Sequence, residues 1–132
     1  MEIQFFDDPF EAPRAREDVR LKQLGIFVHE DKRRVAIGFD LTRFLERPCL
    51  EVTITNANGK WASSLNVIET LETNFSLTMH LRDQEPTERY AVTAVVYYDH
   101  PEQKERQVVH TYQADFPLIP GDQTQPPQEN NE

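Results

Sequence analysis

Apolar and polar residues alternate along most of this chain, from Val19 to Pro117. Three stretches show the pattern most clearly, with apolar residues at every second position and polar or small residues between them: 35–41, 50–54 and 75–81. A period of two puts alternate side chains on opposite faces of a β-strand, so one face can be buried while the other meets solvent. The pattern therefore predicts amphipathic strands.

Seven such stretches fill the centre of the chain, and each is closed by a turn signal; we expect strands over about 19–29, 33–41, 50–55, 60–68, 74–82, 89–99 and 106–116. Short strands at near-regular spacing are typical of an all-β sandwich or barrel. The sequence thus predicts a single antiparallel β-sandwich of seven or eight strands over 19–117. An N-terminal arm (1–18), whose residues 2–6 suit a short edge strand, precedes it, and a disordered acidic tail (118–132) follows it.

Two local features are expected inside this pattern. The alternation changes phase between Leu21 and Leu24, which predicts a β-bulge near Lys22–Gln23. Asn58-Gly59 separates two of the apolar stretches, and both residues tolerate positive φ. We therefore expect a two-residue type I′ hairpin at this point.

The net charge of -9 is concentrated at the two ends of the chain. Residues 1–18 hold six acids and two arginines (-4), and residues 118–132 hold three acids and no base (-3). The central 99 residues are close to neutral at -2. Because affinity for nucleic acid requires a basic face, we expect no nucleic-acid partner.

The single cysteine, Cys49, excludes an intramolecular disulfide. The first residues lack the basic and long apolar regions of a secretion signal. No apolar run approaches the roughly 18 residues of a membrane span. These features favour a cytoplasmic protein with no membrane partner.

The segment Pro86-Thr87-Glu88-Arg89-Tyr90-Ala91-Val92 places a tyrosine at the start of a strand, after a turn that contains proline. With seven strands in about 100 residues, the chain resembles immunoglobulin-like and fibronectin type III-like β-sandwiches. The resemblance implies that Tyr90 is a structural corner residue whose hydroxyl bonds the backbone a few residues upstream. Trp61 falls on the fourth strand rather than the third, and the cysteine pair of antibody domains is absent. Such folds host unrelated functions, so the resemblance implies an architecture alone.

No motif typical of catalysis, metal binding or phosphate binding is present in the sequence. His100, between Asp99 and Glu102, is the best candidate for an acid–base group, but turn chemistry alone explains these residues and is our preferred interpretation. Among the sequence neighbours of Cys49, only Arg47 could activate the thiol, so we expect a small buried hydrophobe rather than a nucleophile. We therefore predict no enzyme, and no catalytic residue, cofactor or metal.

Loop acids and exposed aromatic residues suggest a rival function. In an immunoglobulin-like order the turns at 30–32 and 83–88 share one end of the sandwich, and together they carry Glu30, Asp31, Asp83, Glu85 and Glu88. Such acids could hold Ca²⁺ as C2-type loops do, although five flanking bases favour ordinary surface ion pairs. The alternative function is therefore a ligand-binding sandwich that takes Ca²⁺ or, through aromatic residues such as Trp61, Tyr97 or Tyr98, a carbohydrate.

The N-terminal arm interleaves acids with the apolar residues Ile3, Phe5, Phe6 and Phe10. Such a segment suits docking into a groove or addition to a sheet edge, on its own chain or on a neighbour. We predict these four residues as interaction residues. The expected function is a non-catalytic protein-interaction or structural module that recognises a protein partner, and a small enzyme that uses His100 is a second alternative.

Overall fold

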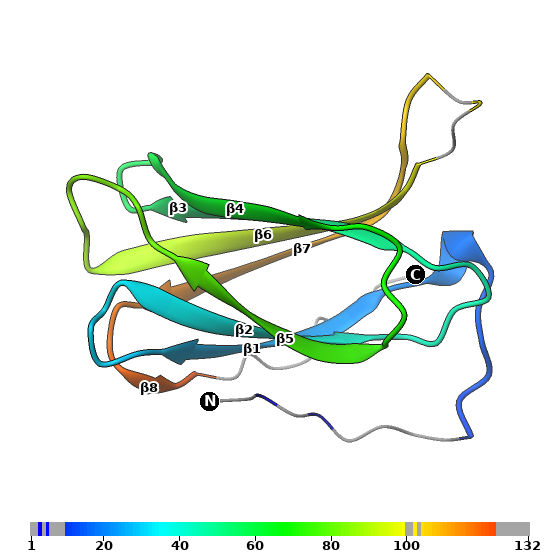
Figure 1. The fold of residues 1–132 in the computed structure, drawn as a ribbon, viewed down its shortest axis with the longest axis horizontal. Coiled ribbons are helices and arrows are strands. Elements are labelled where there is room, and N and C mark those ends of the chain that lie inside the picture. Colours follow the sequence, from blue (N-terminus) through cyan, green and yellow to red (C-terminus); the bar gives the residue numbers. More distant parts are fainter. Residues whose placement is uncertain (1–2, 4, 6–9, 100–101, 103, 124–132) are drawn as a thin grey trace.

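The chain folds into two antiparallel β-sheets packed face to face (Figure 1). The computed structural model describes residues 3, 5, 10–99, 102 and 104–123. A short 3₁₀ helix, Arg16–Asp18, precedes the strands. These are β1 (Leu21–Val28), β2 (Arg34–Leu41), β3 (Cys49–Asn56), β4 (Trp61–Val67), β5 (Asn74–His80), β6 (Arg89–Tyr98), β7 (Gln107–Pro117) and β8 (Gly121–Asp122).

The strand order is β5-β2-β1-β8 in one sheet and β4-β3-β6-β7 in the other. Every neighbouring pair is antiparallel. The chain crosses between the sheets after β2, β4, β5 and β7. This arrangement confirms the predicted antiparallel sandwich of seven or eight strands. The predicted bulge is confirmed too, because the register between β1 and β2 shifts between Leu21 and Gln23.

The core lies between the inner faces of the two sheets. Alternate side chains of β1 and β2 point into it, among them Ile26, Ile37 and Phe39, which have no exposed surface. The opposite sheet supplies Leu50, Val52, Ile54, Val92, Ala94, Val96 and Phe116, also without exposed surface. Because burial of an aliphatic or Phe side chain contributes about 1.5–3 kcal/mol, these two rows hold the sheets together.

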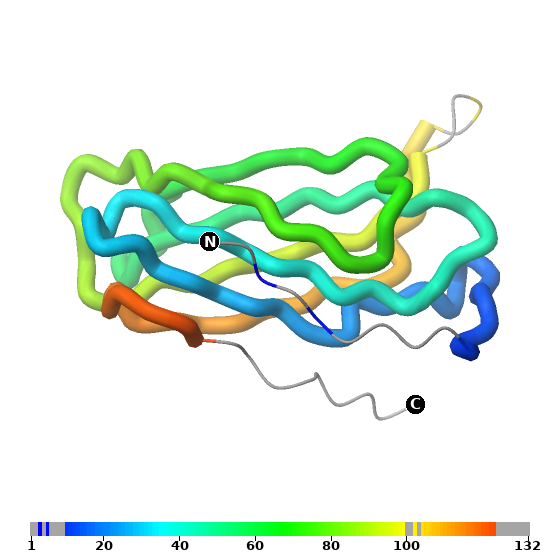
Figure 2. Tube along the Cα trace, turned by 60° about the horizontal axis from the view of Figure 1, so that its bottom comes forward, coloured from blue at the N-terminus to red at the C-terminus, as the bar shows by residue number. Residues whose placement is uncertain are grey.

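The sandwich continues past Pro117, the predicted end of the domain. Leu118 packs against the core, and its N–H donates to the carbonyl oxygen of Glu88 at 2.8 Å. β8 then pairs with the end of β1 (Figure 2), and the N–H of Gln123 donates to the carbonyl oxygen of Ile26 at 2.6 Å. The predicted start of the tail is therefore too early, since backbone hydrogen bonds hold residues 118–123 to the sandwich. Residues 124–132 of the predicted tail lie outside the described residues.

The β3–β4 hairpin differs from the expected type I′ turn. Gly59 has a positive φ of 74°, but Asn58 does not. The N–H of Gly59 donates to the carbonyl oxygen of Asn56 at 3.0 Å, and the N–H of Asn56 donates to that of Lys60 at 2.9 Å, which closes a three-residue loop. The side chain of Asn56 explains the difference, because its Oδ1 accepts the N–H groups of both Asn58 and Lys60 at 3.0 Å.

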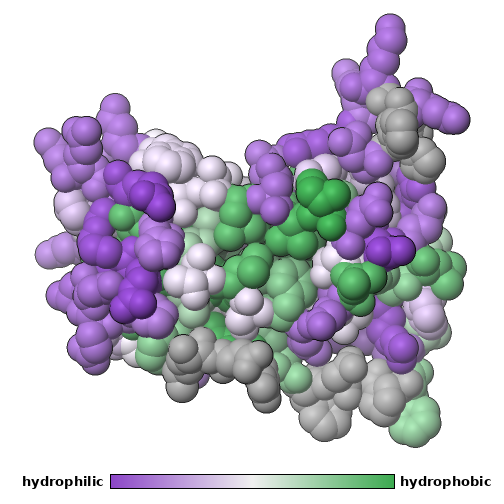
Figure 3. All heavy atoms as spheres, in the orientation of Figure 1, coloured by the Kyte–Doolittle hydropathy of each residue, from purple (hydrophilic) through white to green (hydrophobic). Residues whose placement is uncertain are grey.

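One long side of the sandwich is lined by the edge strands β4 and β5. Near one end the N–H of Arg82 donates to the carbonyl oxygen of Ala62 at 2.7 Å, which joins the two sheets. Between the edges, half-buried apolar side chains pack against the core: Leu65, Val67, Phe75 and Leu77. An apolar area at the centre of the face in Figure 3 marks this side.

Candidate functional site

Outward positions of three neighbouring strands form a groove across one sheet. Gly25 of β1 is paired in register with Gly38 of β2, and Gly38 is paired with Ser76 of β5. The three residues face outward, because their neighbours in the strands, such as Ile26 and Ile37, point into the core. Two adjacent glycines leave the backbone uncovered. Gly25, Gly38 and Ser76 thus form a row of outward positions with no side chain larger than serine, here called the arm groove.

The N-terminal arm occupies the arm groove. The N–H of Ile3 donates to Oγ of Ser76 at 3.1 Å, and the Ser76 hydroxyl donates to the carbonyl oxygen of Ile3 at 2.8 Å. The ring of Phe5 lies beside the two glycines. In Figure 2 the described arm residues lie in front of β1 and β2. The arm therefore docks on the face of its own sheet, and one serine bonds both backbone groups of Ile3.

Space, rather than backbone freedom, requires glycine at these two positions. Neither Gly25 nor Gly38 has a positive φ. A Cβ atom at Gly25 would lie 2.5 Å from Cγ2 of Ile3 and 3.2 Å from Cζ of Phe5. A Cβ atom at Gly38 would lie 2.6 Å from Cγ2 and 2.8 Å from Cβ of Ile3. A larger residue at either position and the docked arm therefore exclude one another.

A buried carboxylate lies next to the arm groove. Asp40 follows Gly38 on the outward side of β2 and is 4% exposed. Gln23 Nε2 donates to Asp40 Oδ2 at 3.1 Å, and Lys22 Nζ lies 3.7 Å from Oδ1. Burial raises the pKa of the Asp40 carboxyl, although Gln23 and Lys22 oppose the shift. Lys22 also contacts Glu11 Oε1 at 3.3 Å, so this cluster ties the arm to β1.

The structure separates the residues predicted for interaction. Ile3 and Phe5 are half-buried in the arm groove, whereas Phe10 is 92% exposed. Phe6 lies outside the described residues. The expected edge strand is not found in the described part of residues 1–18. Ile3 and Phe5 lie over the sheet face instead, where Gly25 and Gly38 leave room for their side chains.

Sequence reasoning missed the groove itself, which is formed by Gly25, Gly38 and Ser76. A signal was present in the second strand, where the outward positions carry Ala36 and Gly38. A solvent-exposed outer face normally carries polar residues at such positions. Small residues there indicate that another segment packs on the strand.

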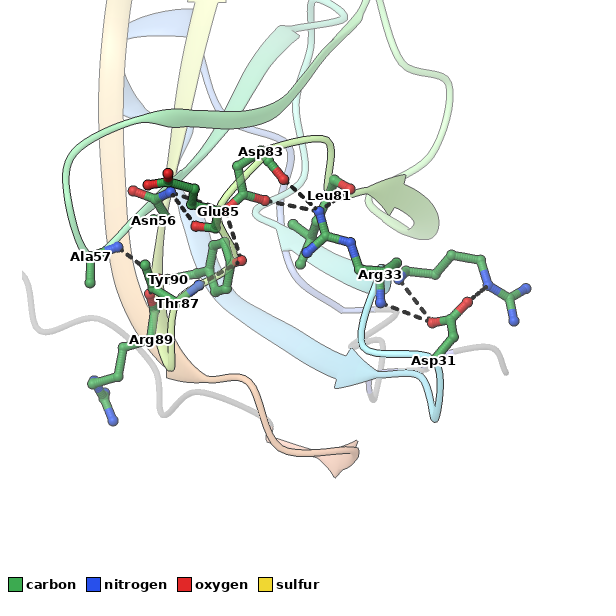
Figure 4. A network of polar contacts seen from close by, with 11 residues as sticks. Asp31, Arg33, Asn56, Ala57, Leu81, Asp83, Glu85, Thr87, Arg89 and Tyr90 are labelled. Atoms are coloured by element: carbon green, nitrogen blue, oxygen red, sulfur yellow. Dashed lines mark hydrogen bonds and ion pairs between the residues drawn. The ribbon is translucent and has the colours of Figure 1, made fainter.

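A second polar cluster surrounds Tyr90 at one end of the sandwich (Figure 4). Tyr90 is 2% exposed. Its hydroxyl donates to Oδ2 of Asp83 at 2.9 Å and accepts the N–H of Thr87, three residues upstream, at 3.3 Å. Asn56 Nδ2 donates to the same Asp83 oxygen at 3.0 Å, and Arg33 Nη2 donates to Oδ1 at 3.1 Å. One carboxylate thus links the residue before β2, the end of β3 and the start of β6.

Two carboxylates at this end of the sandwich, those of Asp83 and Asp31, accept hydrogen bonds from neighbouring residues. Burial opposes ionisation of Asp83, but hydrogen bonds from Asn56, Tyr90 and Arg33 outweigh it and lower the pKa of the carboxyl. The backbone N–H of Arg33 and the side chain of Arg34 lower the pKa of Asp31 to about 2. Within the described residues, no group of three or more His, Cys, Asp or Glu side chains could hold a metal ion. Of the five acids that suggested a calcium site, Asp83 and Asp31 form ion pairs, with Arg33 and Arg34.

Of the candidate nucleophile and the candidate acid–base group, the structure describes the nucleophile alone. His100 lies outside the described residues. His110 Nδ1 accepts the N–H of Leu21 at 2.9 Å. Cys49 is buried, and its Sγ accepts the N–H of Glu69 at 3.4 Å. Each of these two side chains accepts a hydrogen bond from the backbone of a segment distant in sequence.

The three aromatic residues considered for carbohydrate binding have different surroundings. Tyr97 and Tyr98 are 5% and 4% exposed, with the guanidinium groups of Arg106 and Arg16 4.5 Å and 5.0 Å from their ring centroids. Burial raises the pKa of Tyr98 to about 12. Trp61 is 51% exposed. Of these three rings, Trp61 alone presents a wide surface to solvent.

Comparison with known proteins gives no family: no protein-family model matches the chain, and a search of curated proteins finds no match. The part of the chain that the structure describes has no helix with the length and apolar character needed to cross a membrane. The site must therefore be interpreted from its own geometry.

Proposed function

We propose that this chain is a non-catalytic protein-interaction module that acts in the cytoplasm and has an immunoglobulin-like, fibronectin type III-like sandwich. The distribution of strands supports the resemblance. β1, β2 and β5 share one sheet and β3, β6 and β7 share the other, as the corresponding strands do in a constant-type immunoglobulin domain. The buried tyrosine at the start of β6 agrees with it.

The occupied arm groove is the observation that carries the proposal. The Ser76 hydroxyl bonds the backbone N–H and carbonyl oxygen of Ile3, while Gly25 and Gly38 provide room for the side chains of Ile3 and Phe5. Backbone bonds of this kind accept many sequences, and the pockets for alternate side chains select among them. The proposed partner therefore supplies an extended segment with an aliphatic residue followed two positions later by an aromatic one, as in Ile3-Gln4-Phe5.

The arm then acts as a resident competitor for the partner. A tethered segment competes at an effective concentration in the millimolar range. A partner segment of similar chemistry must therefore bind more tightly than the arm, or release of the arm must come first. The two acids that follow, Asp7 and Asp8, give the competing segment a negative charge that the partner need not share.

A labelled peptide of residues 1–10 tests the proposal against three full-length chains. The first is the wild type. The second carries Ile3→Asp and Phe5→Asp, which release the arm, and the third adds Gly38→Val, which blocks the groove. We expect the arm-released chain to bind the peptide, the wild type to bind it on the order of tenfold more weakly, and the blocked chain not to bind it.

A peptide that carries the same two aspartates is the matched control and should bind to none of the chains. Thermal melting of each variant establishes that it is folded. The proposal fails if the folded arm-released chain does not bind the peptide, or if Gly38→Val leaves its affinity unchanged.

A further inference from the structure

A surface cavity of about 270 Å³ lies beside Tyr90, at the end of the sandwich where the β3–β4 hairpin meets the β5–β6 loop. The hairpin contributes Asn58, Lys60 and Trp61, and the loop contributes Gln84 and Glu85. Asn56 and Asp83, both buried, also line it. Its volume falls just below the roughly 300–1,000 Å³ of sites for drug-sized ligands, so it suits one small ring.

The buried part of this cavity is fixed before any ligand arrives. Asn56 Nδ2 donates to Asp83 Oδ2 at 3.0 Å and to the carbonyl oxygen of Glu85 at 3.4 Å. Its Oδ1 accepts the N–H groups of Asn58 and Lys60. One amide thus holds the hairpin and the loop together. Preorganisation of this kind lowers the entropic cost of binding.

The rim of the cavity combines an aromatic face with polar groups that have no protein partner. Trp61 is 51% exposed. Within the described part of the chain, the side chains of Asn58, Gln84 and Glu85 make no hydrogen bond or ion pair, and all three are exposed. Two amides and a carboxylate supply both donors and acceptors. They surround the cavity next to the indole ring.

We infer that this cavity binds one pyranose ring of a neutral saccharide. The apolar C–H face of a pyranose matches the electron-rich face of an indole. Its ring of hydroxyl groups matches the two amides and the carboxylate, since each hydroxyl both donates and accepts. Lys60 and Glu85 place opposite charges on the rim, and Arg33 neutralises Asp83, so the lining favours neither a cation nor an anion. This inference is independent of the arm groove.

Tryptophan fluorescence provides a direct test, because Trp61 is the only tryptophan in the chain. Methyl glycosides of glucose, galactose, mannose and N-acetylglucosamine are titrated into the full-length chain. We expect a saturable change in emission with at least one of them, with a millimolar Kd. Calorimetry with the same glycoside gives a second readout that does not depend on the fluorophore.

Substitutions then locate the site. Trp61→Ala should abolish the calorimetric signal, and Gln84→Ala should weaken binding about threefold to tenfold, the effect of one lost hydrogen bond. Val108→Ala, which truncates a half-exposed side chain on β7, is the matched control and should change nothing. Retention of the signal by folded Trp61→Ala, or the absence of saturation with every glycoside, would overturn the inference.

To identify the source of the sugar, binding of the chain to a glycoprotein is measured before and after enzymatic removal of the glycans. Binding to the intact glycoprotein that is tighter than binding to any free oligosaccharide assigns the ring to a protein-attached glycan. Binding that persists after the glycans are removed, or saturable quenching by a proline-rich peptide alone, contradicts a saccharide site.

Discussion

The outer faces of the two sheets carry different residues, although both sheets follow the same alternation. On the β5-β2-β1-β8 sheet the outward residues Ala36 and Asp40 are 1% and 4% exposed. On the β4-β3-β6-β7 sheet the outward Thr93 is half-buried, and Gln113 beside it on β7 is exposed. The period of two is the same in both, so it does not distinguish a covered face from a bare one. The contacts of the outward residues do, because the arm packs over Gly25 and Gly38 of the first sheet.

The largest effect is expected from filling the groove on the covered face. Gly38→Val places a Cβ 2.6 Å from Cγ2 of Ile3, so the valine must displace the arm. We expect the free energy of unfolding to fall by about 1–3 kcal/mol, as for other overpacked sites. Denaturant unfolding measures it. Thr93→Val on the opposite sheet is the control, and its free energy of unfolding should stay within about 0.5 kcal/mol of wild type. Equal losses for the two variants would show that the two outer faces do not differ in this respect.

A smaller loss is expected from removing the arm's main apolar contact. Ile3→Asp should lower the free energy of unfolding by about 1 kcal/mol, roughly half the value for a fully buried aliphatic side chain, because Ile3 is only half-buried. Phe10→Asp alters a 92% exposed residue of the same arm and should have little effect. Thermal or denaturant melts compare the two. A larger loss for Phe10→Asp would mean that the arm is held chiefly by its later residues.

Loss of the serine that bonds the arm backbone should have a still smaller effect. Ser76→Ala removes the two hydrogen bonds to Ile3, and we expect a loss of about 0.5–1 kcal/mol because the contact is only partly buried. The same substitution in an Ile3→Asp background should cost almost nothing, since the arm is already released. A double-mutant cycle measures this coupling, and additive losses would show that Ser76 acts independently of the arm.

The smallest expected difference concerns pH and compares two buried carboxyl groups. Burial raises the pKa of Asp40 in the folded state, so protonation favours folding as the pH falls from neutral through that raised pKa. Burial opposes ionisation of Asp83, but hydrogen bonds lower the pKa of its carboxyl in the folded state. The stabilisation that the ionised Asp83 carboxylate contributes is therefore lost as the pH falls through that lowered pKa. On acidification, wild type should gain stability relative to Asp40→Asn and lose it relative to Asp83→Asn. Unfolding curves over a series of pH values measure both differences, and a shift of the same sign for the two variants contradicts this assignment.

The alternation predicted the strands well because inward residues such as Ile37 and Val52 recur at every second position of the local sequence. The structure buries these residues. The bulge between Leu21 and Gln23 was equally visible as a change of phase. The hairpin type was not, since Asn56 lies before the Asn58-Gly59 pair and its side chain replaces a backbone partner.

The candidate sites depend on residues that are distant in sequence. Ser76 meets Ile3 only because β5 pairs with β2, and Asp83 meets Arg33 and Asn56 only because three separate segments converge at one end. No local pattern specifies such encounters. The sequence predicted that the arm is apolar enough to dock, but the place of docking follows from the topology of the sheet.

The contact between Ile3 and Ser76 also has a consequence for synthesis on the ribosome. The two residues are 73 positions apart, so the arm emerges long before its groove exists. At about 5–20 residues per second, the interval is roughly 4–15 s. During that time Ile3 and Phe5 have no sheet to cover, and the neighbouring acids Asp7 and Asp8 are the charges that keep an apolar segment from aggregating. Asp7 and Asp8 thus matter while the chain is nascent, whereas Ile3 and Phe5 cover the sheet in the finished fold.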